Sequence, residues 1–147
     1  MVQVYTKEEL QGGISSLNFL NTKGNFIISS FDKTHPRSLA CMQSMAECNN
    51  ICLGRVYHYH ELTSQTVPKY LMNICCFDEN NVIFLNKFEE ALYSIVSGIS
   101  NKYYKYSIIL VPELNQWVPK EYYGVITDLI TRYFKNLQDI KVIYYHA

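Results

Sequence analysis

The chain has 147 residues, 48% of them hydrophobic, and its 13 basic and 13 acidic side chains give a formal net charge of zero. This length and composition predict a single domain with a real core, and the balanced charge argues against nucleic acid as a partner. No apolar run approaches the roughly 18 residues that a membrane-spanning helix needs, and no signal sequence opens the chain. We therefore expect a soluble, cytoplasmic protein without membrane contact.

Cysteine usage supports this expectation. The five cysteines are odd in number and form no CxxC pair, and the last two are adjacent on a predicted strand, so they would face opposite sides of a sheet. We interpret all five as reduced thiols that pack as small hydrophobic side chains, as is usual in the cytosol. They are Cys41, Cys48, Cys52, Cys75 and Cys76.

The N-terminal region is predicted to contain a short strand and a short helix. Residues 2–5 alternate like a short strand, and Thr6 with Glu9 forms a capping box for a helix that Gly12 and Gly13 interrupt. We expect residues 1–24 to form an additional N-terminal strand or a lid.

Strands and helices then alternate. The apolar run at 25–30 predicts the first buried strand, and Pro36 opens a helix over residues 36–46. Residues 55–60 and 69–77 predict two further strands.

The second half continues this alternation. Asn86 with Glu89 forms a capping box for a helix with one apolar stripe to Ile99. The C-terminal third then reads as strand 106–111, a polar turn, an amphipathic helix from Pro119 to Phe134, and strand 140–145. This order predicts an α/β fold, a three-layer α/β/α sandwich with a mixed, mostly parallel central sheet.

The polar turn after Pro112 contains the candidate recognition residues. Open α/β sheets bind ligands outside the carboxyl ends of their strands, where this turn would lie. Amide side chains give directional hydrogen bonds and an indole gives a stacking surface, so Glu113, Asn115, Gln116 and Trp117 could recognise a base or a sugar. The alternative is a solvated loop in which Trp117 fixes the start of the helix.

Several of these segments resemble a macro domain, the ADP-ribose-binding fold, over roughly residues 25–145. The likeness is to compact macro domains that remove ADP-ribose from acylated carboxylates and to small phage-encoded relatives. Trp117 falls where the family often has a Trp that opens the last helix. The segments are 25–30 with 36–46, the LGRVY motif at 53–57, the strand at 70–76, and the final series 88–99, 107–112, 117–134 and 139–144.

The resemblance implies binding of ADP-ribose or another adenine nucleotide, such as a signalling derivative, without a cofactor or a resident metal. Asp32 would accept the adenine amino proton and Ser30 would contact the sugar or phosphate region. Asn115 and Gln116 would cover the phosphate or distal ribose, and Trp117 or Tyr122 would form the wall of the site.

The chain departs from the family pattern around the ligand. The turn at 113–118 has no glycine for a diphosphate-wrapping loop, although Asn115 could take the left-handed conformation, and Glu113 adds an opposing charge. The glycine-containing loop before the first long helix is replaced by residues 32–37. The lysine expected after the strand at 70–76 is replaced by Phe77 and Asp78. Binding is therefore favoured over hydrolysis.

Two alternatives remain open. The missing glycines and the 13 tyrosines, a residue type enriched at interfaces, fit a degenerate macro-like scaffold that acts by protein contact, such as a viral or phage factor that inhibits or sequesters a host protein. A hydrolase of ADP-ribose esters or phosphates is the weaker alternative. His58 and His60 have strand spacing that would suit one metal ion, but exposed histidines at a sheet edge are the simpler interpretation.

Overall fold

A mixed sheet forms the centre of the molecule. The computed structural model describes residue 6 and residues 13–61 and 68–147. In this part of the chain the strand order is β2-β3-β1-β4-β5, and only β2 runs antiparallel to its neighbour. Parallel neighbours require crossover connections, which the helices supply. The strands are β1 (Ile14–Asn21), β2 (Val56–His60), β3 (Tyr70–Phe77), β4 (Ile108–Pro112) and β5 (Lys141–Tyr145).

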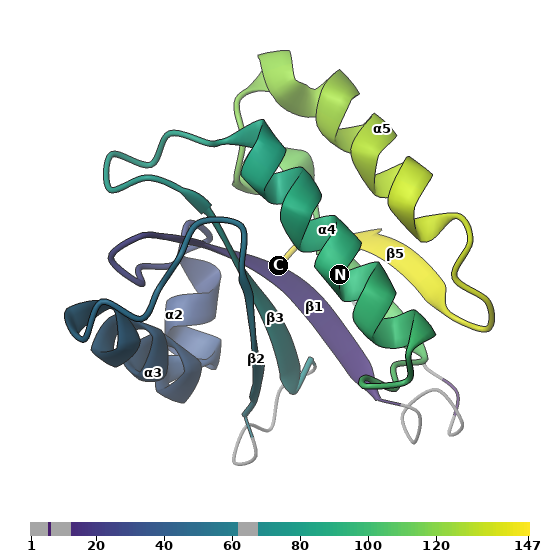
Figure 1. Ribbon diagram of the computed structural model, residues 1–147, viewed down its shortest axis with the longest axis horizontal. Coiled ribbons are helices and arrows are strands. Elements are labelled where there is room, and N and C mark those ends of the chain that lie inside the picture. Colours follow the sequence, from purple (N-terminus) through teal and green to yellow (C-terminus); the bar gives the residue numbers. More distant parts are fainter. Residues whose placement is uncertain (1–5, 7–12, 62–67) are drawn as a thin grey trace.

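Helices cover both faces of this sheet. Figure 1 shows α4 and α5 side by side, with α2 and α3 as a separate pair. Neighbouring residues of β1 point to opposite faces. Phe19 packs against Phe88 of α4, whereas Asn18 bonds Asn73, which in turn bonds Ser38 of α3. The predicted α/β/α sandwich is therefore confirmed. The helices are α2 (Ser30–Thr34), α3 (Pro36–Glu47), α4 (Leu85–Ser100) and α5 (Tyr123–Phe134), with two 3-10 turns, η1 (Leu114–Gln116) and η2 (Lys120–Tyr122).

The first buried strand lies earlier in the chain than predicted. It is β1, at 14–21, in the middle of the sheet, so this part of the N-terminal region is neither an additional edge strand nor a lid. The predicted strand at 25–30 is wrong, because its residues form a turn with a single bridge between Phe26 and Leu20 before α2 begins. The predicted strand at 2–5 and Glu9 of the capping box lie outside the described residues.

The other predicted elements are confirmed with small shifts. The helix over 36–46 is α3, and the strands predicted at 55–60, 69–77, 106–111 and 140–145 correspond to β2, β3, β4 and β5. The Asn86 capping box is wrong, because Phe84 is the N-cap of α4 and makes no side-chain cap bond. The helix expected from Pro119 begins with the turn η2 before α5.

The cysteines follow the prediction in part. All five are free thiols. Cys75 and Cys76 are buried in β3, and burial raises the pKa of the Cys75 thiol to about 12. Cys48 and Cys52 are exposed, so the expectation that all five pack in the interior is wrong for these two. Among the described residues, no helix has both the length and the hydropathy to span a membrane.

Candidate functional site

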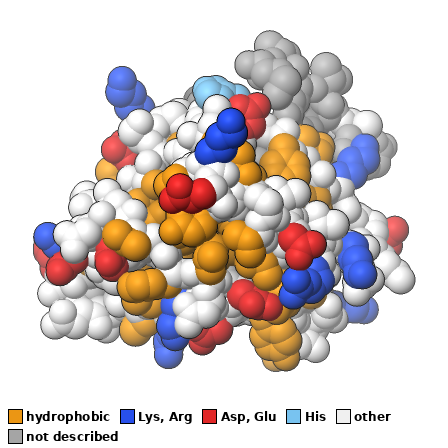
Figure 2. All heavy atoms as spheres, turned by 90° about the horizontal axis from the view of Figure 1, so that it is seen from above, with side chains coloured by type: hydrophobic (Ala, Val, Ile, Leu, Met, Phe, Trp, Pro, Cys, Tyr) orange, Lys and Arg blue, Asp and Glu red, His pale blue; other side chains and the backbone are white. Residues whose placement is uncertain are grey.

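The carboxyl ends of four parallel strands meet at one edge of the sheet. The ends are Phe77, Asn21, Pro112 and Tyr145, and a turn or the last two residues of the chain follow each of them. This edge lies toward the top of Figure 1, and Figure 2 looks onto the molecule from that side. The predicted position of the polar turn after β4, at the carboxyl end of an inner strand, is therefore confirmed.

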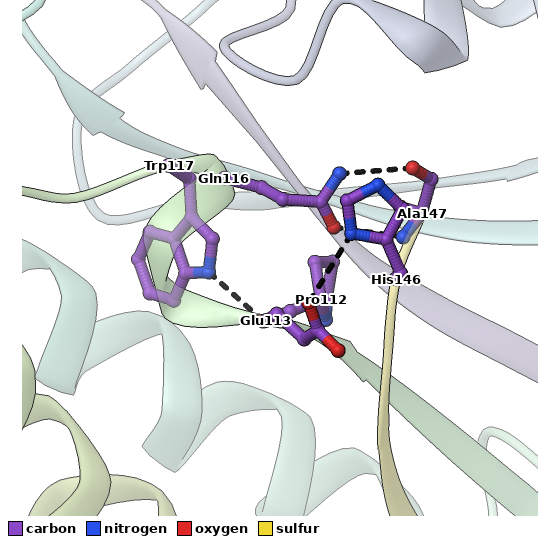
Figure 3. A network of polar contacts seen from close by, with 6 residues as sticks. All are labelled: Pro112, Glu113, Gln116, Trp117, His146 and Ala147. Carbon is purple, nitrogen blue, oxygen red and sulfur yellow. Dashed lines mark hydrogen bonds and ion pairs between the residues drawn. The ribbon is translucent and has the colours of Figure 1, made fainter.

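That turn is tied to the end of β5 (Figure 3). The Gln116 amide donates to the carbonyl oxygen of Ala147 (2.9 Å), and its own Oε1 accepts the Ala147 backbone N–H (2.7 Å). Glu113 Oε2 lies 3.2 Å from His146 Nδ1, and the Glu113 backbone N–H donates to the carbonyl oxygen of Tyr145 (2.8 Å). Two of the predicted recognition residues, Glu113 and Gln116, thus hold the turn against the end of the neighbouring strand.

Trp117 is part of the hydrophobic core. Its side chain is only 4% exposed, and its ring stacks on Phe19 with centroids 3.7 Å apart and planes at 11°. The indole Nε1 donates to the carbonyl oxygen of Pro112 (3.1 Å; Figure 3). The indole therefore anchors the end of η1 in the core, and one of its ring faces is already covered by Phe19.

The backbone amides of the turn are mostly engaged within it. The N–H groups of Gln116, Trp117 and Val118 all donate to carbonyl oxygens at residues 113 and 114. Asn115 is exposed, but it is absent from the residues with positive φ, so it does not adopt the left-handed conformation. A diphosphate at this turn would therefore meet side-chain amides rather than a nest of free backbone donors.

A buried asparagine organises the turns after β1 and β3. Asn21 is 4% exposed, and its Oδ1 accepts the backbone N–H groups of Lys23 (2.9 Å) and Asn25 (3.1 Å). Its Nδ2 donates to Asn81 Oδ1 in the turn after β3 (2.8 Å). Sequence reasoning missed Asn21 because the first strand was placed too late. A polar residue that ends a strand just before Gly24 is the signal that could have indicated it.

A polar hollow lies beside these two turns. Its volume is about 540 Å³, within the usual size range for small-molecule sites. One lysine and two glutamates contribute its charges, and none of the predicted site residues lines it. The lining residues are Thr22, Lys23, Asn25, Gln43, Ala46, Glu47, Asn49 and Glu79.

The remaining predicted residues lie on other elements. Ser30 and Asp32 are exposed on the short helix α2, where partial desolvation raises the pKa of Asp32. Tyr122 is half-buried at the end of η2. Asp78, which follows the strand β3, accepts the N–H groups of Asn80 and Val82 with one oxygen. Its carboxylate therefore stabilises its own turn.

The strand histidines are part of an aromatic cluster. His58 stacks on Tyr104 with centroids 3.9 Å apart, its Nδ1 lies 3.3 Å from Tyr106 Oη, and burial lowers the pKa of His58 to about 4. His60 is exposed and stacks on Tyr70. The expectation of exposure is thus wrong for His58. Within the described ranges, no group of three or more His, Cys, Asp or Glu residues could hold a metal ion.

Comparisons with solved structures define the fold class. No family model matches the chain, and no curated protein matches it. The macrodomain of Thermus aquaticus DarG is 19% identical with a TM-score of 0.71, over 90% of this chain and 89% of that chain. The macrodomain of Mycobacterium tuberculosis DarG is 14% identical with a TM-score of 0.71, over 100% of this chain and 98% of that chain.

A third structure contains a ligand. Thermosipho africanus DarTG, in complex with ADP-ribose, is 17% identical with a TM-score of 0.72, over 90% of this chain and 38% of that longer chain. At these identities the likeness concerns the fold. The chain has the fold of a divergent macro domain, and the resemblance noted in the sequence is confirmed at that level.

Proposed function

We propose that this protein binds ADP-ribose or another adenine nucleotide at the carboxyl edge of its sheet. The observation that carries the proposal is the macrodomain fold, with a polar turn at the end of an inner parallel strand. Ligands of open α/β sheets lie in this position, and one protein of similar fold has been solved with ADP-ribose. The free thiols are consistent with action in the cytoplasm.

Within this proposal the predicted residues keep distinct roles. Asp32 accepts a hydrogen bond from the adenine amino group, and Ser30 contacts the sugar or phosphate region. Asn115, the exposed member of the turn, hydrogen-bonds the distal ribose or phosphate, while Gln116 holds the turn in place through its two hydrogen bonds to Ala147. Tyr122 lines the wall, which Trp117 supports from beneath.

Binding without hydrolysis is the favoured form of the proposal. Asp78 stands where the resemblance would place a lysine, and its carboxylate is hydrogen-bonded to the backbone of its own turn. The Glu113 carboxylate is likewise in contact with His146, so neither group is placed as a free catalytic base. A hydrolase of ADP-ribose esters or phosphates is the weaker alternative. Incubation of the protein in excess with an ADP-ribosylated protein tests it, because release of ADP-ribose would establish hydrolysis and unchanged substrate would exclude it.

Titration calorimetry with ADP-ribose and AMP tests the binding proposal. We expect saturable heat with ADP-ribose, and we expect Asn115→Ala to weaken binding by about threefold to about tenfold through loss of one hydrogen bond. Asn136→Ala, a change at an exposed residue after α5, is the matched control and should leave the affinity unchanged. The absence of heat at millimolar ADP-ribose would eliminate the ADP-ribose form of the proposal, and the absence of heat with both ligands would count against the adenine-nucleotide form as well.

A second candidate function is protein contact, as in a viral or phage factor that inhibits or sequesters a host protein. It is favoured by the exposed Val82 (51%) and Phe84 (37%) in the turn after β3. Figure 2 shows hydrophobic side chains gathered over the middle of this face, with charged side chains around them. Such a patch is typical of an interaction surface. Retention of a specific protein by the wild type but not by Val82→Asp would support this candidate, and a result without any retained partner, alongside nucleotide binding, would reject it.

A further inference from the structure

Among the described residues, β2 forms one end of the sheet, and its pairing with β3 shows which of its backbone groups point outward. Cys75 donates its backbone N–H to the Arg55 carbonyl, and Glu61 donates to the Lys69 carbonyl. In an antiparallel pair every second residue faces its neighbour, so Arg55, Tyr57, Tyr59 and Glu61 face β3. The N–H and C=O groups of the intervening residues Val56, His58 and His60 therefore point away from the sheet.

These outward groups are not used within the described chain. Val56, His58 and His60 make no backbone hydrogen bond beyond the strand itself in the part of the chain that the structure describes. Open strand edges recruit further strands unless charges, prolines or bulges protect them. The sequence VYHYH contains no Lys, Arg, Asp, Glu or Pro, and aromatic residues fill two of its five positions.

We propose that β2 pairs with β2 of a second copy of this chain, antiparallel and about a two-fold axis at His58. Because three residues of each strand face outward, the pairing supplies about six hydrogen bonds, two for each of three residue pairs. His58 lies opposite the partner's His58, and Val56 lies opposite the partner's His60. The two sheets then become one continuous sheet.

The side chains of β2 favour a second copy over an unrelated strand. The sequence VYHYH is almost symmetric about its central residue, His58. Tyr57 of each copy therefore lies opposite Tyr59 of the other copy, which gives two Tyr–Tyr pairs, one on each side of the two-fold axis. Aromatic cross-strand pairs stabilise antiparallel strands, and these two occupy the closely spaced positions that exchange no hydrogen bonds. No charged side chain within β2 opposes a like charge.

The contact is small, which determines how strong the association should be. Five residues a side bury less surface than a standard interface, so we expect a dissociation constant on the order of 10–500 µM. The dimer leaves the carboxyl edge of each copy open, because β2 lies at the far end of the sheet from β4 and β5.

Sedimentation velocity from about 5 µM to about 500 µM tests the proposal across that range. We expect a reversible monomer–dimer equilibrium. His60→Pro removes an outward N–H without touching the β2–β3 ladder and should weaken the dimer at least about tenfold. His60→Ala removes the same side chain but keeps the N–H, so it should remain within about threefold of the wild type.

A second pair of variants covers the case in which His60→Pro does not fold, which circular dichroism would reveal. His58→Glu places two carboxylates directly opposite each other at the axis and should abolish the dimer, whereas the uncharged His58→Gln should retain it. A protein that is monomeric at the highest concentration overturns the proposal. A dimer that is unaffected by both His60→Pro and His58→Glu also overturns it, because its interface would then lie elsewhere.

Discussion

Single polar residues determine much of this structure. Asn21 joins two turns through three hydrogen bonds, and Asn18 reaches α3 through Asn73 and Ser38. Each of these residues except Ser38 lies in a strand, and all four are at most 4% exposed. Buried polar groups must find partners, and among the described residues only Asn18 Oδ1 is buried without one. The sheet therefore depends on specific pairs as well as on apolar burial.

Gly24 is a second position where one residue determines the local structure. Its φ is +77°, and a Cβ added there would clash with the Met42 carbonyl oxygen, a backbone atom. We expect Gly24→Ala to lower the free energy of unfolding by about 2–4 kcal/mol, because both the conformation and the contact oppose a side chain.

Gly124→Ala provides the matched control, measured by urea denaturation alongside Gly24→Ala. Gly124 lies inside α5, and an added Cβ would meet no atom within 4 Å. Alanine has the higher helix propensity, so this change should raise the free energy of unfolding by about 0.5–1 kcal/mol. Equal destabilisation by the two substitutions would contradict the account given for Gly24.

The turn η1 is the element that links the candidate site to the core. The Gln116 side chain of this turn holds Ala147, just after β5. Trp117, which follows the turn, stacks on Phe19 in the core. The arrangement gives a rigid turn with one freely exposed amide, that of Asn115.

Trp117 should therefore be the most sensitive position of this element. Trp117→Phe keeps an aromatic ring but loses the bond to the Pro112 carbonyl, so we expect a loss of about 1–2 kcal/mol in unfolding free energy. Trp117→Ala should cost about 3–5 kcal/mol, because it also leaves a cavity. Tyr103→Ala, at a residue 79% exposed, is the control and should change the stability by less than about 0.5 kcal/mol. An unaltered denaturation midpoint for Trp117→Ala would show that the indole does not anchor the turn.

Sequence patterns predicted those elements whose residues follow a simple period. The apolar runs of β3 and β4 and the stripes of α4 and α5 have such patterns, and all four elements were predicted. The strand β1 reads ISSLNFLN, and its serines and asparagines hid a strand that is buried along its whole length. Its burial depends on partners such as Tyr145 and Asn73, far away in sequence, which local patterns do not reveal.

The candidate site was predictable only in part for the same reason. The position of the turn after β4 follows from the alternation of strands and helices along the chain, which sequence periodicity indicates. The pairing of Gln116 with Ala147 and the stacking of Trp117 on Phe19 depend on how β4, β5 and β1 come together. No residue pattern within the turn distinguishes a side chain that awaits a ligand from one that holds the chain.

At the scale of the whole molecule, two histidines, His35 and His58, are withdrawn from solvent and have lowered pKa values. His35 is 1% exposed, with Nε2 2.6 Å from the Pro68 carbonyl oxygen, and burial lowers its pKa despite that bond and the nearby Glu61. His58 lies among tyrosine rings, with its pKa lowered to about 4. Both side chains are therefore neutral in the folded protein under conditions where an unfolded chain would begin to bind protons.

Stability should fall on mild acidification. Between pH 6.5 and about 4 the unfolded chain binds a proton at residue 58 that the folded protein does not, so the free energy of unfolding decreases as the pH falls. We expect a loss of about 1–2 kcal/mol from His58 between pH 7.5 and pH 5. Urea denaturation of the wild type and of His58→Gln at both pH values measures it. The variant should show the smaller loss, and identical losses would contradict the assignment.

The pair of hydrogen bonds between the Gln116 side chain and the backbone of Ala147 has a practical consequence for ligand titrations. Residue 147 is fixed beside the turn that carries Asn115, so any affinity tag or fusion partner joined after it emerges next to the proposed ligand edge. Such an extension would crowd that edge and compete for its polar groups. Material with the tag removed from this end is the proper sample for every titration.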